Sequence, residues 1–338
     1  MEHGGDLSDA IAHFGGEAQA WLDLSTGINP TPWPVPDELL KPFLQRLPAR
    51  ADDEALLDAA RAAYRVPDHV GIVAAPGTQA LIQWLPRLAP AGAVAIATPT
   101  YSEHARAWAV SGHEVLPIDG LDALPADARH AVIVNPNNPD GRIAPLDAIR
   151  RAATSVRERG GWLVVDEAFI DVIPDATAAS LCTDLPLIIL RSFGKFYGLG
   201  GLRLGFAIAA PATIELIHGG LGPWSVAGPA LAIGAAALRD ATWASDMRRK
   251  LGQQADRLDA ILKATGGSIV GGTSLFRLMR HPGAASIHQQ LARQHIWSRK
   301  FSYADDLLRF GLPHTDQDFT RLSEALAPHG LTPPPRER

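Results

Sequence analysis

Between residues 70 and 210, short apolar runs alternate with stretches of helical periodicity, and this alternation constrains the fold more than any other feature of the chain. Runs with the length and composition of buried strands occupy 70–75, 93–97, 114–118, 130–134, 162–165, 185–190 and 206–210. Strands separated by helices form a mainly parallel sheet between helices. Ligands of such sheets bind at the carboxyl ends of the strands. The sequence therefore predicts an α/β fold with a functional site along that edge.

The totals describe an ordinary soluble globule of 338 residues, long enough for two domains. A net charge of −5 gives no reason to expect nucleic acid or an anionic membrane as a partner. The single cysteine, Cys182, excludes an internal disulfide and suits a reducing cytosol. No apolar run approaches the length of a membrane-spanning helix, and no signal-peptide pattern opens the chain. We therefore expect a cytoplasmic protein.

The segment 190–206, LRSFGKFYGLGGLRLGF, places Lys195 in a glycine-rich loop between two predicted strands. A desolvated lysine loses proton affinity and becomes a usable amine nucleophile. A phosphate-binding P-loop would need glycine in place of Ile189, and a dinucleotide fingerprint would need glycine in place of Arg203. The remaining chemical interpretation is a Schiff-base lysine, with Ser192 and Arg203 as ligands for an anion. The alternative is a flexible surface loop with an incidental lysine.

Four further candidates follow the ends of other predicted strands: Gly77, Tyr101, Asn138 and Asp166. Gly77 lies between a strand and a helix that starts at Thr78, where backbone N–H groups can bind an anion. An ionised Asp166 after an apolar strand needs a partner, and Tyr101 can stack on an aromatic ring. Each also has an ordinary structural interpretation: a cap for Asp166, a turn for Asn138 and core packing for Tyr101.

The pattern Ser-x-x-Lys followed by Gly-x-Arg-x-Gly resembles the pyridoxal-phosphate lysine segment of class I and II aminotransferases, which have fold type I. The resemblance implies pyridoxal phosphate as the cofactor, bound covalently through Lys195, and no metal. It also implies that Asp166 pairs with the ring nitrogen, Asn138 with the phenolic oxygen and Tyr101 with the ring face. The residues implied to hold the phosphate are Gly77, Thr78, Ser192 and Arg203.

Segments outside that shared set are similar to those of the threonine-phosphate decarboxylases of cobalamin biosynthesis: HGG at 3–5, LDLSTGINP at 22–30, GPWSVAGPA at 222–230 and RKFSYADDLLRFGLP at 299–313. This resemblance implies decarboxylation of L-threonine O-3-phosphate, with Lys195 and Asp166 as catalytic residues. It makes His3, Arg299 and Arg309 candidates for binding the substrate's phosphate or carboxylate. A terminal arm for His3 and a solvated surface charge for Arg299 are the alternatives.

Three positions depart from the patterns of these families. Phe169 stands where many of these aminotransferases have a tyrosine that contacts the cofactor. Leu47 stands where relatives have a tyrosine that reaches a partner's cofactor phosphate. Pro313 fills the expected place of an arginine that binds the substrate carboxylate, which leaves that role to Arg299 or Arg309.

Two other functions compete with the decarboxylase. Histidinol-phosphate aminotransferase shares the fold, the cofactor and a phosphorylated substrate, but Phe169 and Pro313 count against it. A non-catalytic sensor domain of a transcription regulator would carry a basic DNA-binding domain, and only a short arm precedes the fold here. A globular α/β protein without any cofactor is the remaining alternative.

The expected domain organisation follows the same resemblance. Residues 1–33 form an arm that packs on the small domain or on a partner, 34–224 form the large cofactor domain, and 225–338 form a smaller α/β domain. Strand candidates in the last part lie at 271–279, 296–301 and 307–312. We expect a homodimer with active sites at the subunit boundary.

Overall fold

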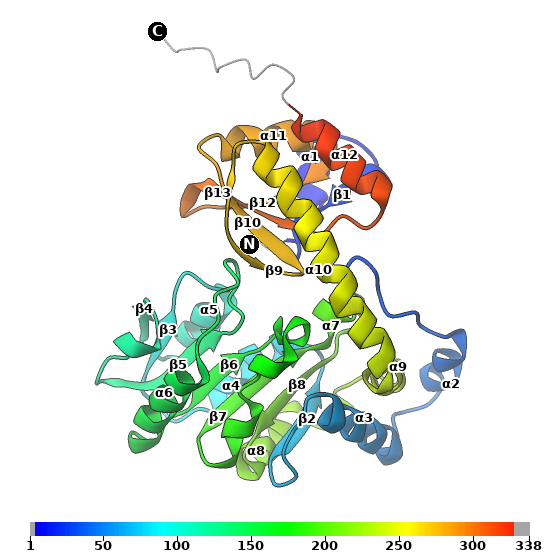
Figure 1. Cartoon of the computed structure of the whole chain (residues 1–338). Coiled ribbons are helices and arrows are strands. Elements are labelled where there is room, and N and C mark those ends of the chain that lie inside the picture. The colour runs from blue at the N-terminus through cyan, green and yellow to red at the C-terminus, as the bar shows by residue number, and fades with distance from the viewer. Residues whose placement is uncertain (1–3, 328–338) are drawn as a thin grey trace. The chain divides into compact units, whose positions relative to one another are not determined.

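The computed structural model of this chain describes residues 4–327, which divide into two compact units (Figure 1). One unit runs from Thr31 to Arg249, and the other combines the described residues up to Pro30 with those from Lys250 onward. The boundaries expected at 33/34 and 224/225 differ from these limits. They stay a proposal about domains, because a compact unit need not fold or move on its own.

The unit from Thr31 to Arg249 is built on a seven-stranded sheet with the strand order β2-β8-β7-β6-β5-β3-β4. Its strands are β2 (Gly71–Ala75), β3 (Ala93–Ala97), β4 (Val115–Ile118), β5 (Ala128–Val134), β6 (Leu163–Asp166), β7 (Leu187–Ser192) and β8 (Gly205–Ala209). Strand β8 runs in the opposite direction to the other six strands, which all point the same way. The carboxyl ends of the other strands therefore lie along one edge, and the expected mainly parallel α/β sheet is confirmed.

Helices cover this sheet. They are α2 (Lys41–Leu44), α3 (Arg50–Ala63), α4 (Thr78–Leu88), α5 (Glu103–Val110), α6 (Leu146–Glu158), α7 (Phe193–Phe196), α8 (Pro211–Leu221) and α9 (Gly228–Arg239), while α10 (Ala241–Ala264) begins here and continues past Arg249. Short 3-10 turns are η2 (Asp37–Leu39), η3 (Leu121–Ala123), η4 (Ile170–Val172), η5 (Pro174–Ala176), η6 (Ala179–Thr183) and η7 (Gly200–Leu202). Every residue of β6, β7 and β8 is buried. Strands buried on both faces read as continuous apolar runs, which explains their pattern in the sequence.

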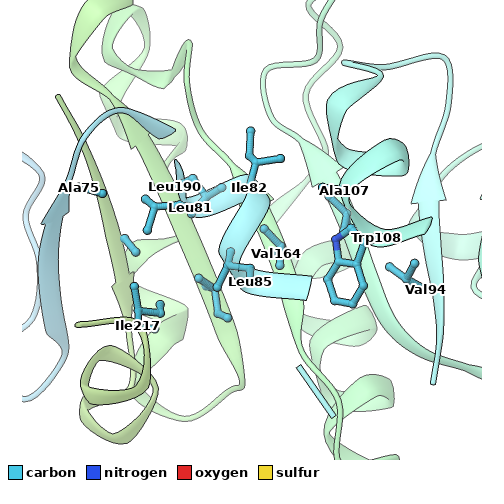
Figure 2. Packing of buried hydrophobic residues seen from close by; sticks show 14 of the residues in the cluster. Ala75, Leu81, Ile82, Leu85, Val94, Ala107, Trp108, Val164, Leu190 and Ile217 are labelled. Carbon is cyan, nitrogen blue, oxygen red and sulfur yellow. The ribbon is translucent and has the colours of Figure 1, made fainter. Parts of the chain in front are cut away.

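Helix α4 packs on one face of the sheet, and its apolar side chains lie in the middle of the hydrophobic core there (Figure 2). Its Leu81, Ile82 and Leu85 are almost fully buried. They belong to one cluster with Val164 and Leu190 of the sheet, together with side chains from α5 and α8. Because α4 starts just after β2 ends, this packing fixes its N-terminus at the carboxyl edge of the sheet.

The second unit contains the four-stranded antiparallel sheet β12-β13-β10-β9 and the two-stranded parallel pair β1-β11. Its elements are α1 (Ser8–Phe14), η1 (Ala18–Ala20), β1 (Leu22–Asp23), β9 (Ser268–Thr273), β10 (Phe276–Arg280), α11 (Ala284–Arg293), β11 (Ile296–Trp297), β12 (Arg299–Phe301), β13 (Ala304–Gly311) and α12 (Asp316–Leu326). Ala10, Trp21 and Ala292 form a small core that joins the N-terminal segment to α11. The described part of the N-terminal arm is thus built into the same unit as the C-terminal strands.

The single strand expected at 271–279 is wrong. The structure has a hairpin there, in which β9 ends at Thr273 and β10 begins at Phe276. The Thr273 hydroxyl accepts a hydrogen bond of 3.1 Å from the backbone N–H of Leu275 and so closes the turn. Threonine and serine make such local turns, and Gly271 and Gly272 just before them are a further turn signal that the single-strand expectation did not use.

Two kinds of feature are absent from residues 4–327. None of the helices in this range is long and apolar enough to cross a membrane. The same residues contain no group of three or more His, Cys, Asp or Glu side chains placed to hold a metal ion.

Candidate active site

The site begins with the register of three strands. Ala75 at the end of β2 lies opposite Gly205 of β8, and Gly205 lies opposite Ser192 at the end of β7. The glycine turn after β2, the lysine segment after β7 and the arginine loop before β8 therefore meet at one place. The register brings together the residues that the sequence assigned to an anion: Gly77, Thr78, Ser192 and Arg203.

Two glycines permit this approach. A Cβ at Gly205 would lie 2.5 Å from the backbone nitrogen of Thr78, a distance that no side chain tolerates. Gly77 has φ +83, and a Cβ there would lie 2.7 Å from Nη2 of Arg203. The Arg203 guanidinium thus lies against the first turn of α4. Since the first N–H groups of a helix lack intrahelical acceptors and carry the positive end of its dipole, this cradle suits a phosphate.

Lys195 lies in α7, directly after the end of β7. Its side chain is half-buried, and Nζ lies 5.7 Å from the centroid of the Phe169 ring. Phe193 and Phe196, on either side of it, are fully buried. Aromatic packing on both flanks therefore fixes the helical turn that carries the amine.

Tyr197 continues this packing. Its ring is stacked between Phe193, with centroids 4.5 Å apart, and Trp243 of α10, with centroids 5.5 Å apart. Its backbone oxygen accepts a hydrogen bond of 2.9 Å from the N–H of Trp33. Burial raises the pKa of Tyr197 far above its usual value, so the phenol stays neutral and acts as a packing group.

Asp166, the last residue of β6, has a partner that sequence reasoning missed. Nε2 of His104 lies 2.9 Å from Oδ2 of Asp166, and both side chains are almost fully buried. Oδ1 of Asp166 accepts a hydrogen bond of 3.0 Å from the N–H of Ala168. An ionised carboxylate only accepts hydrogen bonds, so Nε2 carries the proton in this pair. The available signal was the i, i+3 spacing of Tyr101 and His104, which places both on one side of a helical turn.

Asp166 lies opposite Leu190, two residues before Ser192. Adjacent strands are roughly 4.8 Å apart. The strand that ends in Asp166 is therefore the direct neighbour of the strand that ends in Ser192, while the other cradle residues lie beside β8 and β2, further along the same edge.

A buried ion cluster supports these strand ends from the residues next to them. Arg191 precedes Ser192, and its guanidinium contacts Asp171 and lies 3.3 Å from Oε2 of Glu167, the residue after Asp166. The guanidinium carbon lies 4.0 Å from the centroid of the Tyr64 ring. Burial raises the pKa of Glu167 against the opposing effect of Arg191. Removal of one partner would leave an uncompensated buried charge, which is strongly destabilising.

Tyr101 follows β3 and its hydroxyl donates a hydrogen bond of 3.1 Å to Oε1 of Gln79. Burial, the charge of Glu103 and the charge of Asp166 together raise the pKa of Tyr101 to about 12. The phenol is therefore neutral over the physiological range and available as a flat stacking surface.

The two central asparagines of the turn after β5 have different surroundings. Asn137 is buried, and its amide nitrogen donates to the backbone oxygen of Pro99 and to Asp140 at 3.0 and 2.8 Å. Its side-chain oxygen accepts a hydrogen bond of 2.7 Å from Thr100. Asn137 is thus committed to the turn. Asn138 is half-buried, and its contact with the cofactor stays a prediction.

The other unit brings Arg299 and Arg309 together. They lie directly opposite each other on β12 and β13. Arg309 is buried, and its Nη2 donates a hydrogen bond of 2.7 Å to the backbone oxygen of Ser25. Burial and the neighbouring Arg299 charge lower the pKa of Arg309 to about 10. Like charges opposite each other repel, so this pair is suited to an anionic ligand.

The remaining expectations have different outcomes. His3 lies outside the described residues. Leu47 is exposed and Pro313 is buried. The cradle residues and Asp166 lie in the unit from Thr31 to Arg249, whereas Arg299 and Arg309 lie in the other unit.

The candidate residues of the unit from Thr31 to Arg249 fit pyridoxal phosphate. The cradle matches a phosphate, the half-buried amine of Lys195 matches the cofactor's carbonyl carbon, and buried Asp166 matches a cationic ring nitrogen. A buried carboxylate is costly unless it is paired. His104 and the N–H of Ala168 each give Asp166 one hydrogen bond, and each carboxylate oxygen can accept a further donor.

Comparison with known proteins gives the family context. The model of the family described as "Aminotransferase class I and II" matches residues 54–326. A threonine-phosphate decarboxylase from a Sinorhizobium species is 43% identical over 96% of this chain and 97% of that protein. A threonine-phosphate decarboxylase from Pseudomonas aeruginosa is 39% identical, with the same shares covered.

Among solved structures, the histidinol-phosphate aminotransferase from Sinorhizobium meliloti in complex with pyridoxal-5'-phosphate superposes with a TM-score of 0.82. The match covers 95% of this chain and 93% of that one at 20% sequence identity. At this identity the likeness shows the fold alone.

The close contact at Gly205 gives a test of the cradle. Gly205→Ala should weaken the binding of pyridoxal phosphate to the apoprotein by about fivefold or more, because overpacking costs roughly 1–3 kcal/mol. Gly201→Ala, in the same loop with open space around its Cβ, is the matched control. Absorbance titration measures both affinities, and equal affinities for the two variants would show that this contact does not form the cradle.

Proposed function

We propose that this chain, which belongs to the class I and II aminotransferase family, decarboxylates L-threonine O-3-phosphate to (R)-1-aminopropan-2-ol O-phosphate and carbon dioxide with pyridoxal phosphate as cofactor. The proposal rests on the identity of 43% and 39%, over 96% of this chain, with two proteins named threonine-phosphate decarboxylase. The product would serve the nucleotide loop of cobalamin.

The cofactor, when bound, supplies an electron sink for the electron pair left as the carboxylate departs. The residues of this chain position it. Ser192, Arg203 and the first turn of α4 would bind its phosphate, and Tyr101 would pack on the ring face. Asp166, oriented by His104, would keep a proton on the ring nitrogen. Lys195 would hold the cofactor through Nζ, and the same amine would return a proton to the substrate Cα.

The reaction type depends on which substrate bond is held perpendicular to the ring. Residues that bind the substrate's two anionic groups therefore decide the outcome. Arg299 and Arg309, opposed across two strands, are the proposed ligands of these groups. Arg309 is already oriented by Ser25 and Phe276, the ring of which lies 5.2 Å from the guanidinium carbon. Arg299 is less buried, and we assign the phosphate to it.

We further propose a cytoplasmic homodimer. Leu44, Leu47 and Trp224 are large apolar side chains that are more than half exposed, which is typical of an interface surface. A Cβ at Gly228 would lie 2.6 Å from the backbone oxygen of Phe43, so α2 and the segment that carries Trp224 are close together. The single cysteine is buried, as suits a reducing compartment.

Histidinol-phosphate aminotransferase remains the second candidate because its fold is shared. Phe169 argues against it. This ring is buried and lies near the Lys195 amine, in the place where many aminotransferases have a tyrosine hydroxyl. The chain is 20% identical to that histidinol-phosphate aminotransferase and 43% identical to the Sinorhizobium threonine-phosphate decarboxylase, which also favours the decarboxylase.

A paired assay separates the two functions. The loaded protein should release carbon dioxide and aminopropanol phosphate from threonine phosphate, and it should not form glutamate from oxoglutarate with histidinol phosphate. Product identification by mass spectrometry measures both. Amino transfer without carbon dioxide release would assign the chain to the second candidate, and the absence of both products would refute the proposed function.

Arg299 should select the phosphorylated substrate. Arg299→Ala should lower the preference for threonine phosphate over threonine, measured as the ratio of kcat/KM, by about one to two decades. The reason is that a charge-assisted contact contributes roughly 1.5–3 kcal/mol. Arg299→Lys should recover only part, since lysine supplies no planar fork.

The control for this ratio is Arg280→Ala, which changes an exposed arginine of the same unit. An unchanged ratio in Arg299→Ala would mean that Arg299 does not bind the phosphate. A rise of KM for both substrates alike would assign Arg299 to the carboxylate.

A further inference from the structure

A chain of hydrogen bonds links Tyr101 to two side chains with no assigned role. The Tyr101 hydroxyl donates to Oε1 of Gln79 at 3.1 Å, and Nε2 of Gln79 donates to Oε2 of Glu103 at 3.2 Å. Glu103 is buried, with only 7% of its surface exposed. Gln79 is half-buried and directly follows Thr78 of the anion cradle.

The link joins two distant parts of the sheet. Gln79 lies in the first turn of α4, after β2, while Tyr101 and Glu103 follow β3. Four strands separate β2 from β3 in the sheet. Helix α4 packs on α5, the helix that follows Tyr101. The side chain that follows the phosphate cradle thereby contacts the aromatic ring expected to stack on the cofactor.

The direction of each hydrogen bond is determined by chemistry. An ionised carboxylate only accepts, so the amide nitrogen of Gln79 must face Glu103. The amide oxygen must then face Tyr101, which makes the phenol the donor. Arg106, with Nη1 3.8 Å from Oε1 of Glu103, supplies a nearby positive charge. The order carboxylate, amide, phenol therefore permits one orientation of the tyrosine hydroxyl.

We propose that Gln79 and Glu103 are positioning residues that fix the plane of Tyr101 relative to the anion cradle. The hydrogen bond holds the hydroxyl oxygen and so limits rotation of the ring about the Cα–Cβ bond. A phenolic O–H lies in the plane of its ring, so the direction to Oε1 of Gln79 also limits rotation about the Cβ–Cγ bond. Because Gln79 is adjacent to Thr78, the tilt of the ring and the place of the phosphate are set by the same helical turn. The inference rests on the proposed function for the identity of the ligand, pyridoxal phosphate.

The test is a double-mutant cycle of the full chain with Gln79→Met, Tyr101→Phe and both together. Tyr101→Phe keeps the stacking ring and removes only the hydroxyl. Each single change should weaken pyridoxal phosphate binding by about 3- to 10-fold, the usual effect of one hydrogen bond. The double variant should bind as weakly as either single variant, because both remove the same contact. If Gln79→Met lowered the affinity for pyridoxal phosphate by the same factor in the wild type and in Tyr101→Phe, the proposal would be overturned.

Circular dichroism of the bound cofactor gives a readout that depends on ring orientation. Its visible band should change in Gln79→Met and Tyr101→Phe alike and stay unchanged in Gln83→Met, which alters the same helix one turn further on. Glu103→Gln should change the band less, since an amide at this position can donate or accept. An unchanged band in Gln79→Met would also overturn the proposal.

Two controls keep the outcomes distinct. Thermal unfolding of each apoprotein checks that it is folded, and Gln79→Leu replaces Gln79→Met in the cycle if the latter is not. A wild-type protein that does not bind pyridoxal phosphate would refute the proposed function, and the positioning role with it. Wild-type binding combined with additive losses would refute the positioning role alone.

Discussion

The close contact between Gly205 and the backbone of Thr78 is the constraint on which the rest of the site depends. It exists because β8 runs antiparallel between β2 and β7, with Gly205 opposite both Ala75 and Ser192. Neither Gly205 nor Gly77 has room for a side chain. The absence of those two Cβ atoms lets an arginine, a serine and a helix N-terminus approach the same point.

Around that point, polar side chains are held by partners from distant parts of the chain. His104 orients Asp166, Gln79 contacts Tyr101, and Arg191 joins the residues that follow β6 to the end of β7. Hydrogen-bonded partners orient buried polar groups without exposing them to water. The site therefore has a supporting layer as specific as the residues expected to touch the ligand.

The sequence predicted what is encoded locally. The strand ends, the turn at Gly77, the lysine segment and the arginine at 203 are each marked by an abrupt change from apolar residues to glycine or polar ones. His104 and the contact of Gln79 with Tyr101 were not predicted, because both arise from the packing of α4 and α5 beside the sheet, which no local pattern reports. The hairpin at 268–280 was missed for a different reason, since the run of Gly271, Gly272, Thr273 and Ser274 marks a turn that the expectation of one strand overlooked. The opposition of Arg299 and Arg309 likewise depends on the register of β12 and β13.

The central claim is that this edge of the sheet places the cofactor on Lys195. The chain has five lysines, and the other four, Lys41, Lys250, Lys263 and Lys300, are exposed. Borohydride reduction of the protein loaded with pyridoxal phosphate, followed by proteolysis and mass spectrometry, locates the attachment directly. The account predicts one pyridoxyl adduct, on the peptide that contains Lys195, and its loss in Lys195→Ala. Adducts spread evenly over the exposed lysines, or none at all, would contradict it.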